Sequence, residues 1–84
     1  MVKYIIARQI VGKKVVTSDG FDIGRLFDAD ISETTGKINY LLVEINPDSS
    51  FANKLKNENN QVKIPYSALV AANDFVVVDR KELS

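Results

Sequence analysis

The chain has 84 residues, of which 11 are basic and 11 acidic, and it contains neither cysteine nor histidine. This length fits a single domain over residues 1–84; the composition excludes disulfides and leaves zinc only carboxylate ligands, so self-association is the expected source of extra stability. The zero net charge argues against binding nucleic acid through phosphates, and no apolar run approaches the roughly 18 residues that span a bilayer, so we expect a cytoplasmic protein without membrane insertion.

The N-terminal third of the chain predicts two strands joined by a tight turn. Residues 2–11 are apolar with interleaved charges and fit either a short strand or a helical turn. Residues 13–17 are rich in β-branched side chains, which favours a strand, and a Ser-Asp-Gly turn follows them. A longer strand is expected over residues 21–31. Because its apolar residues change parity, this strand is either buried on both faces or carries a β-bulge near Leu26 and Phe27.

The clearest strand of the chain is expected over residues 37–46, because apolar side chains occupy both of its faces. One face must belong to the core, and the other must meet a second layer, the N-terminal segment or another molecule. The first apolar set consists of Ile38, Tyr40 and Leu42. The second set is the one that we predict to form an interface: Leu41, Val43 and Ile45.

The polar segment 48–60 predicts a long loop with one helical turn. Phe51 and Leu55 are four residues apart in this segment, a spacing that places them on one side of a helical turn. An aromatic residue in a polar loop is either tucked back against the body as a plug or exposed as an interface anchor. Both alternatives stay open for Phe51, and we include Phe51 and Leu55 in the candidate interface.

The C-terminal third adds the remaining strands. Residues 61–64 predict a short strand, a helical turn follows Pro65, and residues 75–78 predict a last strand before a polar tail. The chain therefore holds five to six short antiparallel strands with one short helical turn. Close spacing of short strands and turns is typical of an all-β fold, and we predict a small β-barrel.

Five short motifs follow one another in an order that resembles a known family. They are Gly-Lys-Lys-Val-Val at 12–16, Asp-Gly-Phe-Asp-Ile-Gly-Arg-Leu at 19–26 with Asp28 after it, Ile-Asn-Tyr-Leu-Leu-Val at 38–43, Ile-Pro-Tyr at 64–66 and Asn-Asp-Phe-Val-Val-Val at 73–78. The set resembles the PRC-barrel family over residues 8–79, and the length resembles its short, stand-alone archaeal members. The polar insert at 48–60 is longer than the loop of a minimal barrel.

The resemblance implies a PRC-type β-barrel that acts as an adaptor and not as an enzyme. Members of the family serve as assembly modules in the photosynthetic reaction centre and in ribosome maturation, and some short archaeal members are tied to cell division. We therefore expect a homodimer that bridges other cytoplasmic proteins, with cell division as the implied setting. The alternative is an RNA- or ribosome-associated maturation factor, and a small-molecule-binding barrel ranks last because side chains usually fill barrels of this size.

No residue set predicts a catalytic, cofactor or metal site. Asp28 and Asp30 could work as paired carboxylates, but the sequence places no nucleophile around them, so we interpret them as solvated. The Asp-x-x-Asp pair at 19–22 lacks the further ligands of a calcium loop. Basic pairs at 13–14 and 54–56, with aromatic residues, could form a platform for single-stranded nucleic acid, but the zero net charge argues against it.

Overall fold

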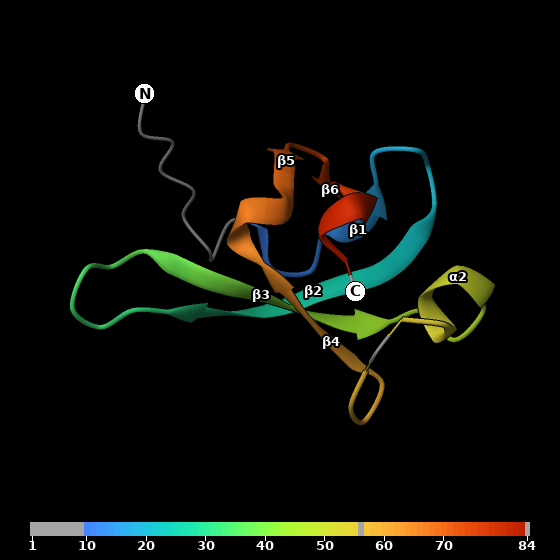
Figure 1. Ribbon diagram of the computed structural model, residues 1–84, viewed down its shortest axis with the longest axis horizontal. Helices are drawn as coiled ribbons and strands as arrows, with labels where there is room; N and C mark the ends of the chain where they lie inside the picture. Colours follow the sequence, from blue (N-terminus) through green and yellow to red (C-terminus); the bar gives the residue numbers. More distant parts are fainter. Residues whose placement is uncertain (1–9, 56, 84) are drawn as a thin grey trace.

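The chain folds around one six-stranded sheet, shown in Figure 1. The computed structural model describes residues 10–55 and 57–83. Neighbouring strands follow the order β4-β3-β2-β1-β6-β5. Their bounds are β1 (Lys14–Thr17), β2 (Asp22–Ile31), β3 (Ile38–Ile45), β4 (Gln61–Pro65), β5 (Leu69–Ala72) and β6 (Phe75–Val78). The mostly-β class is confirmed, but within these residues β4 and β5 remain two separate ends, so the sheet is not closed into the predicted barrel.

Two short helical segments connect strands, α2 (Ser50–Asn53) and η1 (Tyr66–Ala68), and a third, η2 (Arg80–Glu82), follows the last strand. The turn η1 is the helical turn predicted after Pro65, and it carries the chain from one end of the sheet to the other. Ala68 in this turn is buried, and its carbonyl oxygen accepts a hydrogen bond from the Asp79 amide over 2.8 Å. No helix in the described ranges is long and apolar enough to cross a membrane.

One strand pair departs from the predicted antiparallel pattern. β1 and β6 run parallel, with Lys14 opposite Phe75 and Thr17 opposite Val78, whereas the other four neighbouring pairs are antiparallel. Parallel neighbours need a long crossover between them, because a tight turn reverses the chain direction. Here the crossover consists of β2 to β5 and their connections. The sequence pattern carries no signal for this pairing, so the prediction of antiparallel strands throughout is wrong at this pair.

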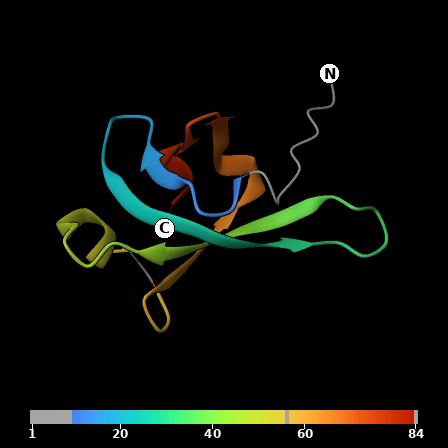
Figure 2. The same ribbon diagram turned by 180° about the vertical axis from the view of Figure 1, so that it is seen from behind.

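β2 is the longest strand, and two bulges, each with an extra residue in β2, bend it (Figures 1 and 2). Its pairing with β1 skips Ile23, and its pairing with β3 skips Phe27. The second shift confirms the bulge predicted near Leu26 and Phe27. The first shift explains the change of apolar parity, because Ile23 and Leu26 are both buried although they differ in parity. The bends allow β2 to pair with β1 and β3 at the same time.

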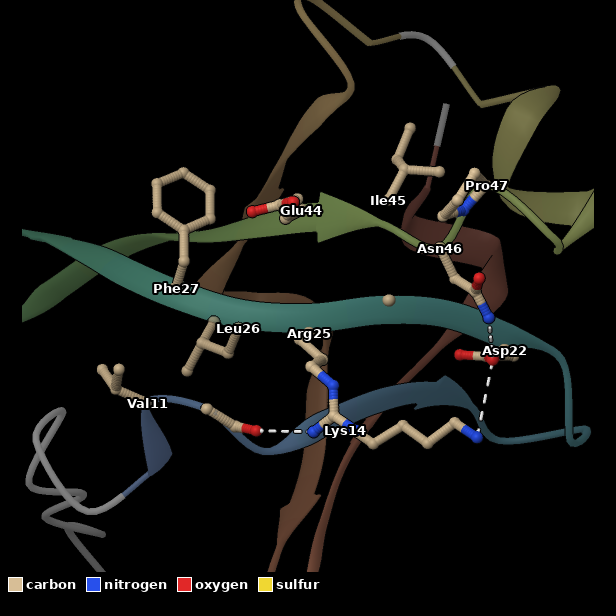
Figure 3. A pocket seen from close by; sticks show the side chains of 12 residues that line it. Val11, Lys14, Asp22, Arg25, Leu26, Phe27, Glu44, Ile45, Asn46 and Pro47 are labelled. Carbon is tan, nitrogen blue, oxygen red and sulfur yellow. Dashed lines mark hydrogen bonds and ion pairs between the residues drawn. The ribbon is translucent and has the colours of Figure 1, made fainter.

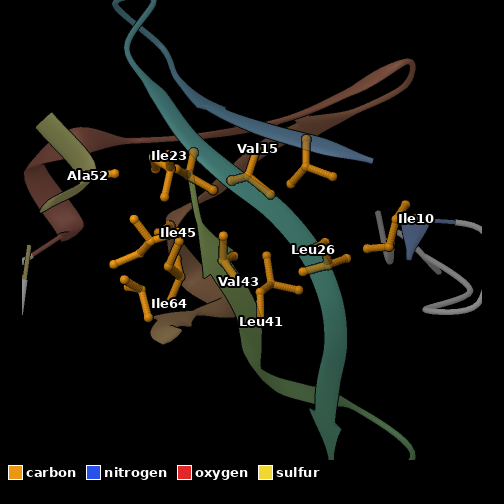
Figure 4. Close-up of a cluster of buried hydrophobic side chains, with 13 residues drawn as sticks. Ile10, Val15, Ile23, Leu26, Leu41, Val43, Ile45, Ala52 and Ile64 are labelled. Atoms are coloured by element: carbon orange, nitrogen blue, oxygen red, sulfur yellow. The ribbon is translucent and has the colours of Figure 1, made fainter. Parts of the chain in front are cut away.

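The core lies on the inner side of the curved sheet (Figure 4). Leu41 and Val43 are 0% exposed and Ile45 is 5% exposed, so the prediction that these three residues form an interface is wrong. They are the centre of the core, because the curled sheet turns this face of β3 inwards. Their cross-strand neighbours Val62 and Ile64 on β4 are buried beside them. The sequence showed that β3 has two apolar faces but not which of them is inside.

The segment after β3 packs against the start of β2. The hydroxyl of Ser49 donates a hydrogen bond to the Asp22 carbonyl over 2.6 Å and caps α2 by accepting one from the Ala52 amide. Phe51 stacks on Phe21 with ring centroids 4.9 Å apart, and both Phe51 and Leu55 pack partly buried against the core. Of the two alternatives for Phe51, the structure therefore favours the plug, with the ring tucked back against the body of the domain. Phe51 and Leu55 both keep part of their surface exposed, so their place in the candidate interface stays a prediction.

Candidate protein-interaction surface

The register of the sheet places two rows of side chains on its outer side. One row crosses five strands and is exposed throughout: Gln61, Glu44, Arg25, Lys14 and Phe75. The second row crosses four strands: Asp22, Val16, Val77 and Ala71. Both rows change from polar or charged on β2 and β3 to apolar on β6 and β5. The outer surface therefore has a charged part and an apolar part that meet at β1.

The apolar outer face, as we call it, comprises Val16, Val70, Ala71, Phe75 and Val77. Phe75 and Val70 are the most exposed large hydrophobic residues that the structure describes, at 52% and 51%. Val70 protrudes because the pairing of β5 with β6 shifts between Leu69 and Ala71, which leaves Val70 without an opposite residue. β5 was not predicted from the sequence. An apolar run of four residues between the helical turn and the Asn-Asp turn was the signal that could have revealed it.

An open groove of about 590 Å³ adjoins this face on the charged side (Figure 3). Three of its four charged side chains are held by contacts within the chain. Arg25 donates a hydrogen bond from Nη1 to the Gly12 carbonyl over 3.1 Å, and Lys14 Nζ lies 3.5 Å from Asp22 Oδ2. Asn46 donates to the same Asp22 oxygen over 2.7 Å. With two basic and two acidic residues in its lining, the groove offers no excess of positive charge for a phosphate backbone.

Other predicted site residues are exposed and dispersed. Asp28 accepts a hydrogen bond from the Ala29 amide over 2.8 Å, and Asp28 and Asp30 lie opposite the apolar or aromatic residues Leu42 and Tyr40. Lys13 donates from Nζ to the Asn73 carbonyl. Among the residues described, no group of three acidic side chains is placed to hold a metal ion. These positions do not gather into a second candidate site.

The β1–β2 turn meets the C-terminal segment at a charged corner. The Thr17 hydroxyl donates a hydrogen bond to Asp19 Oδ1 over 2.7 Å, and this bond holds the pKa of Asp19 below its ordinary value of 3.8. The Arg80 guanidinium, 3.2 Å from Asp19 Oδ2, lowers this pKa further. A carboxyl whose pKa is lower in the folded state contributes stability above its unfolded pKa, and this contribution is lost as the pH falls through the folded value. The corner is therefore expected to weaken below about pH 3.8.

Replacing Thr17 with valine is expected to raise the pKa of Asp19 towards 3.8, because the largest cause of its depression is removed while the shape of the side chain is kept. A carbon-13 NMR titration of the Asp19 carboxyl measures this value directly. Thr35→Val, in the β2–β3 hairpin loop, is the matched control and should leave the Asp19 titration unchanged. An Asp19 pKa that stays the same in Thr17→Val would contradict the role given to the hydroxyl.

The chain matches one family of known proteins. The family model of the PRC-barrel domain matches residues 3–83, which is nearly the whole chain. No curated protein matches the chain significantly. The match includes the five motifs noted in the sequence and the long bent strand β2. The chain therefore belongs to the PRC-barrel domain family.

Proposed function

We propose that this chain is a non-enzymatic protein–protein interaction module of the cytoplasm that self-associates and bridges protein partners. The observation that supports this proposal is the apolar outer face, where Val70 on β5 and Phe75 on β6 are each about half exposed, close to one end of the sheet. Contiguous exposed apolar surface on a small domain is typical of an interaction site. The composition agrees, because a chain without histidine or cysteine lacks the commonest general base and the most reactive nucleophile.

The charge distribution favours protein over nucleic acid as the partner. The basic residues of the groove already contact acceptors within the chain, and Lys63 lies over the Tyr40 ring, 5.0 Å from its centroid. The basic residues of the groove are thus already engaged within the chain, which favours a protein partner over a phosphate backbone. The family resemblance suggests cell division as the setting, and the experiment below is designed to separate this protein-binding role from a ribosome- or RNA-associated one.

Replacing Phe75 with serine is expected to weaken self-association at least about tenfold, because an interface aromatic residue commonly contributes more than about 1 kcal/mol. Sedimentation equilibrium over a wide range of protein concentration measures the dissociation constant. Ile31→Ser is the matched control, since Ile31 is 45% exposed but lies at the far end of β2. The control should self-associate like the wild type.

A wild-type chain that stays monomeric at every concentration would overturn the self-association proposed here. If that monomer instead binds RNA, with an affinity that falls steeply as salt is raised, the RNA-associated function takes first place. Unchanged self-association in Phe75→Ser would show that the apolar outer face is not the interface.

A further inference from the structure

We propose that β5 is the edge at which a second copy of this chain joins the sheet, with the two β5 strands antiparallel across a two-fold axis. This inference deepens the proposed function and rests on its self-association. β5 is an end of the sheet, and among the described residues only β6 pairs with it. The backbone N–H and C=O groups on its other side are therefore available to a strand from another molecule.

The two ends of the sheet differ in how they are protected. β4, at one end, carries Lys63 and Pro65, and both a lysine and a proline on an edge strand prevent another strand from pairing with it. β5, at the other end, reads Leu-Val-Ala-Ala and has no charged residue and no proline. The small side chains of Ala71 and Ala72 also allow close approach. β5 is short and its register shifts at Val70, but it lacks the charge and the proline that protect β4, so of the two ends it is the one more open to a further strand.

The charge pattern indicates that this further strand comes from the same protein. Residues 64–73 form the longest uncharged run in a chain that is 26% charged. A two-fold interface places a patch against its own copy, so any charge near the axis would face a like charge. A patch for a different protein has no such constraint and can use complementary charges. The absence of charge along β5 is therefore what self-pairing requires.

Pairing through β5 also gives a closed assembly. The apolar outer faces of the two copies would become continuous, with Val70 on the strand that forms the junction, which adds buried apolar surface to the backbone hydrogen bonds. The joined sheet would end on both sides in β4, where Lys63 and Pro65 oppose further pairing. The expected product is a dimer and not a fibre.

Single cysteines test this geometry without interference, because the chain contains none of its own. Depending on where the two-fold axis lies, residue 70 faces residue 70 of the second copy, residue 71 faces residue 71, or residue 70 faces residue 71. In each case the cross-strand Cα distance is about 4.5–5.5 Å, which suits a disulfide. Val70→Cys, Ala71→Cys and their equimolar mixture are oxidised separately, with Val11→Cys as the control at a similarly exposed valine (45%). A cross-linked dimer is expected in at least one of the three samples and not in the control.

A second pair of variants tests the edge without cross-linking. Val70→Lys is expected to weaken the dimer at least tenfold in sedimentation equilibrium, with little change in thermal unfolding measured under monomeric conditions, whereas Val11→Lys should leave the dimer intact. The β5 edge would be overturned, and the proposed self-association would stand, if the wild type dimerises, Val70→Lys dimerises equally well and no cysteine variant cross-links. A wild-type monomer at all concentrations would overturn both.

Discussion

Replacing Gly24 with alanine is expected to destabilise the fold by about 3 kcal/mol, because the added methyl group would overlap the Glu44 carbonyl oxygen of β3. β2 and β3 cannot easily move apart to make room for it. The Asn46 amide donates a hydrogen bond to the Ile23 carbonyl over 2.9 Å, directly beside the contact. A domain of this length has roughly 4–13 kcal/mol of total stability. Urea unfolding followed by circular dichroism, at a protein concentration where the chain is monomeric, measures the loss.

Gly36 provides the control for the Gly24 substitution. It also has a positive φ, of 73°, but nothing lies within 4 Å of the position that its Cβ would take. Gly36→Asn should cost less than about 1 kcal/mol, since asparagine tolerates the left-handed conformation. If Gly24→Ala were as stable as Gly36→Asn, the close approach of β2 to β3 would not be the reason for a glycine at position 24.

Truncating Leu41 to alanine is expected to cost about 2–5 kcal/mol, because it leaves a cavity at the centre of the core. Leu41 is fully buried and lies opposite Ile64 on β4 and Ala29 on β2, so the cavity would open between these strands. The loss would remove a large part of the stability of so small a domain. The same urea experiment measures it.

Leu42→Ala is the matched control, with the same chemistry one residue along the same strand. Leu42 points to the outer side of the sheet, where it is only half-buried, so its truncation should cost about 1 kcal/mol or less. Equal losses in the two variants would contradict the orientation of β3, in which only the Leu41 face belongs to the core. The comparison therefore tests the correction of the predicted interface.

Much of this fold follows from local sequence. Five strands, β1, β2, β3, β4 and β6, were predicted from runs of β-branched residues and from turn residues. The bulge in β2 was predicted from the change of apolar parity near Leu26. The ordered motifs were sufficient to indicate the family. These features depend on neighbouring residues along the chain: backbone preference, turn chemistry and the two-residue period of a strand. The short strand β5 was missed because two alanines give no β-propensity and no alternation.

The candidate surface, in contrast, was decided by tertiary structure. β3 is apolar on both faces, and only the curl of the sheet determined that Leu41, Val43 and Ile45 are inside. Phe51 became a plug because Phe21, thirty residues earlier in the chain, lies within stacking distance. The parallel pairing of β1 with β6 brought Lys14 beside Phe75 and so joined the charged and apolar parts of the outer side. Contacts between residues so distant in sequence depend on the topology of the chain, and a local sequence pattern does not indicate that topology.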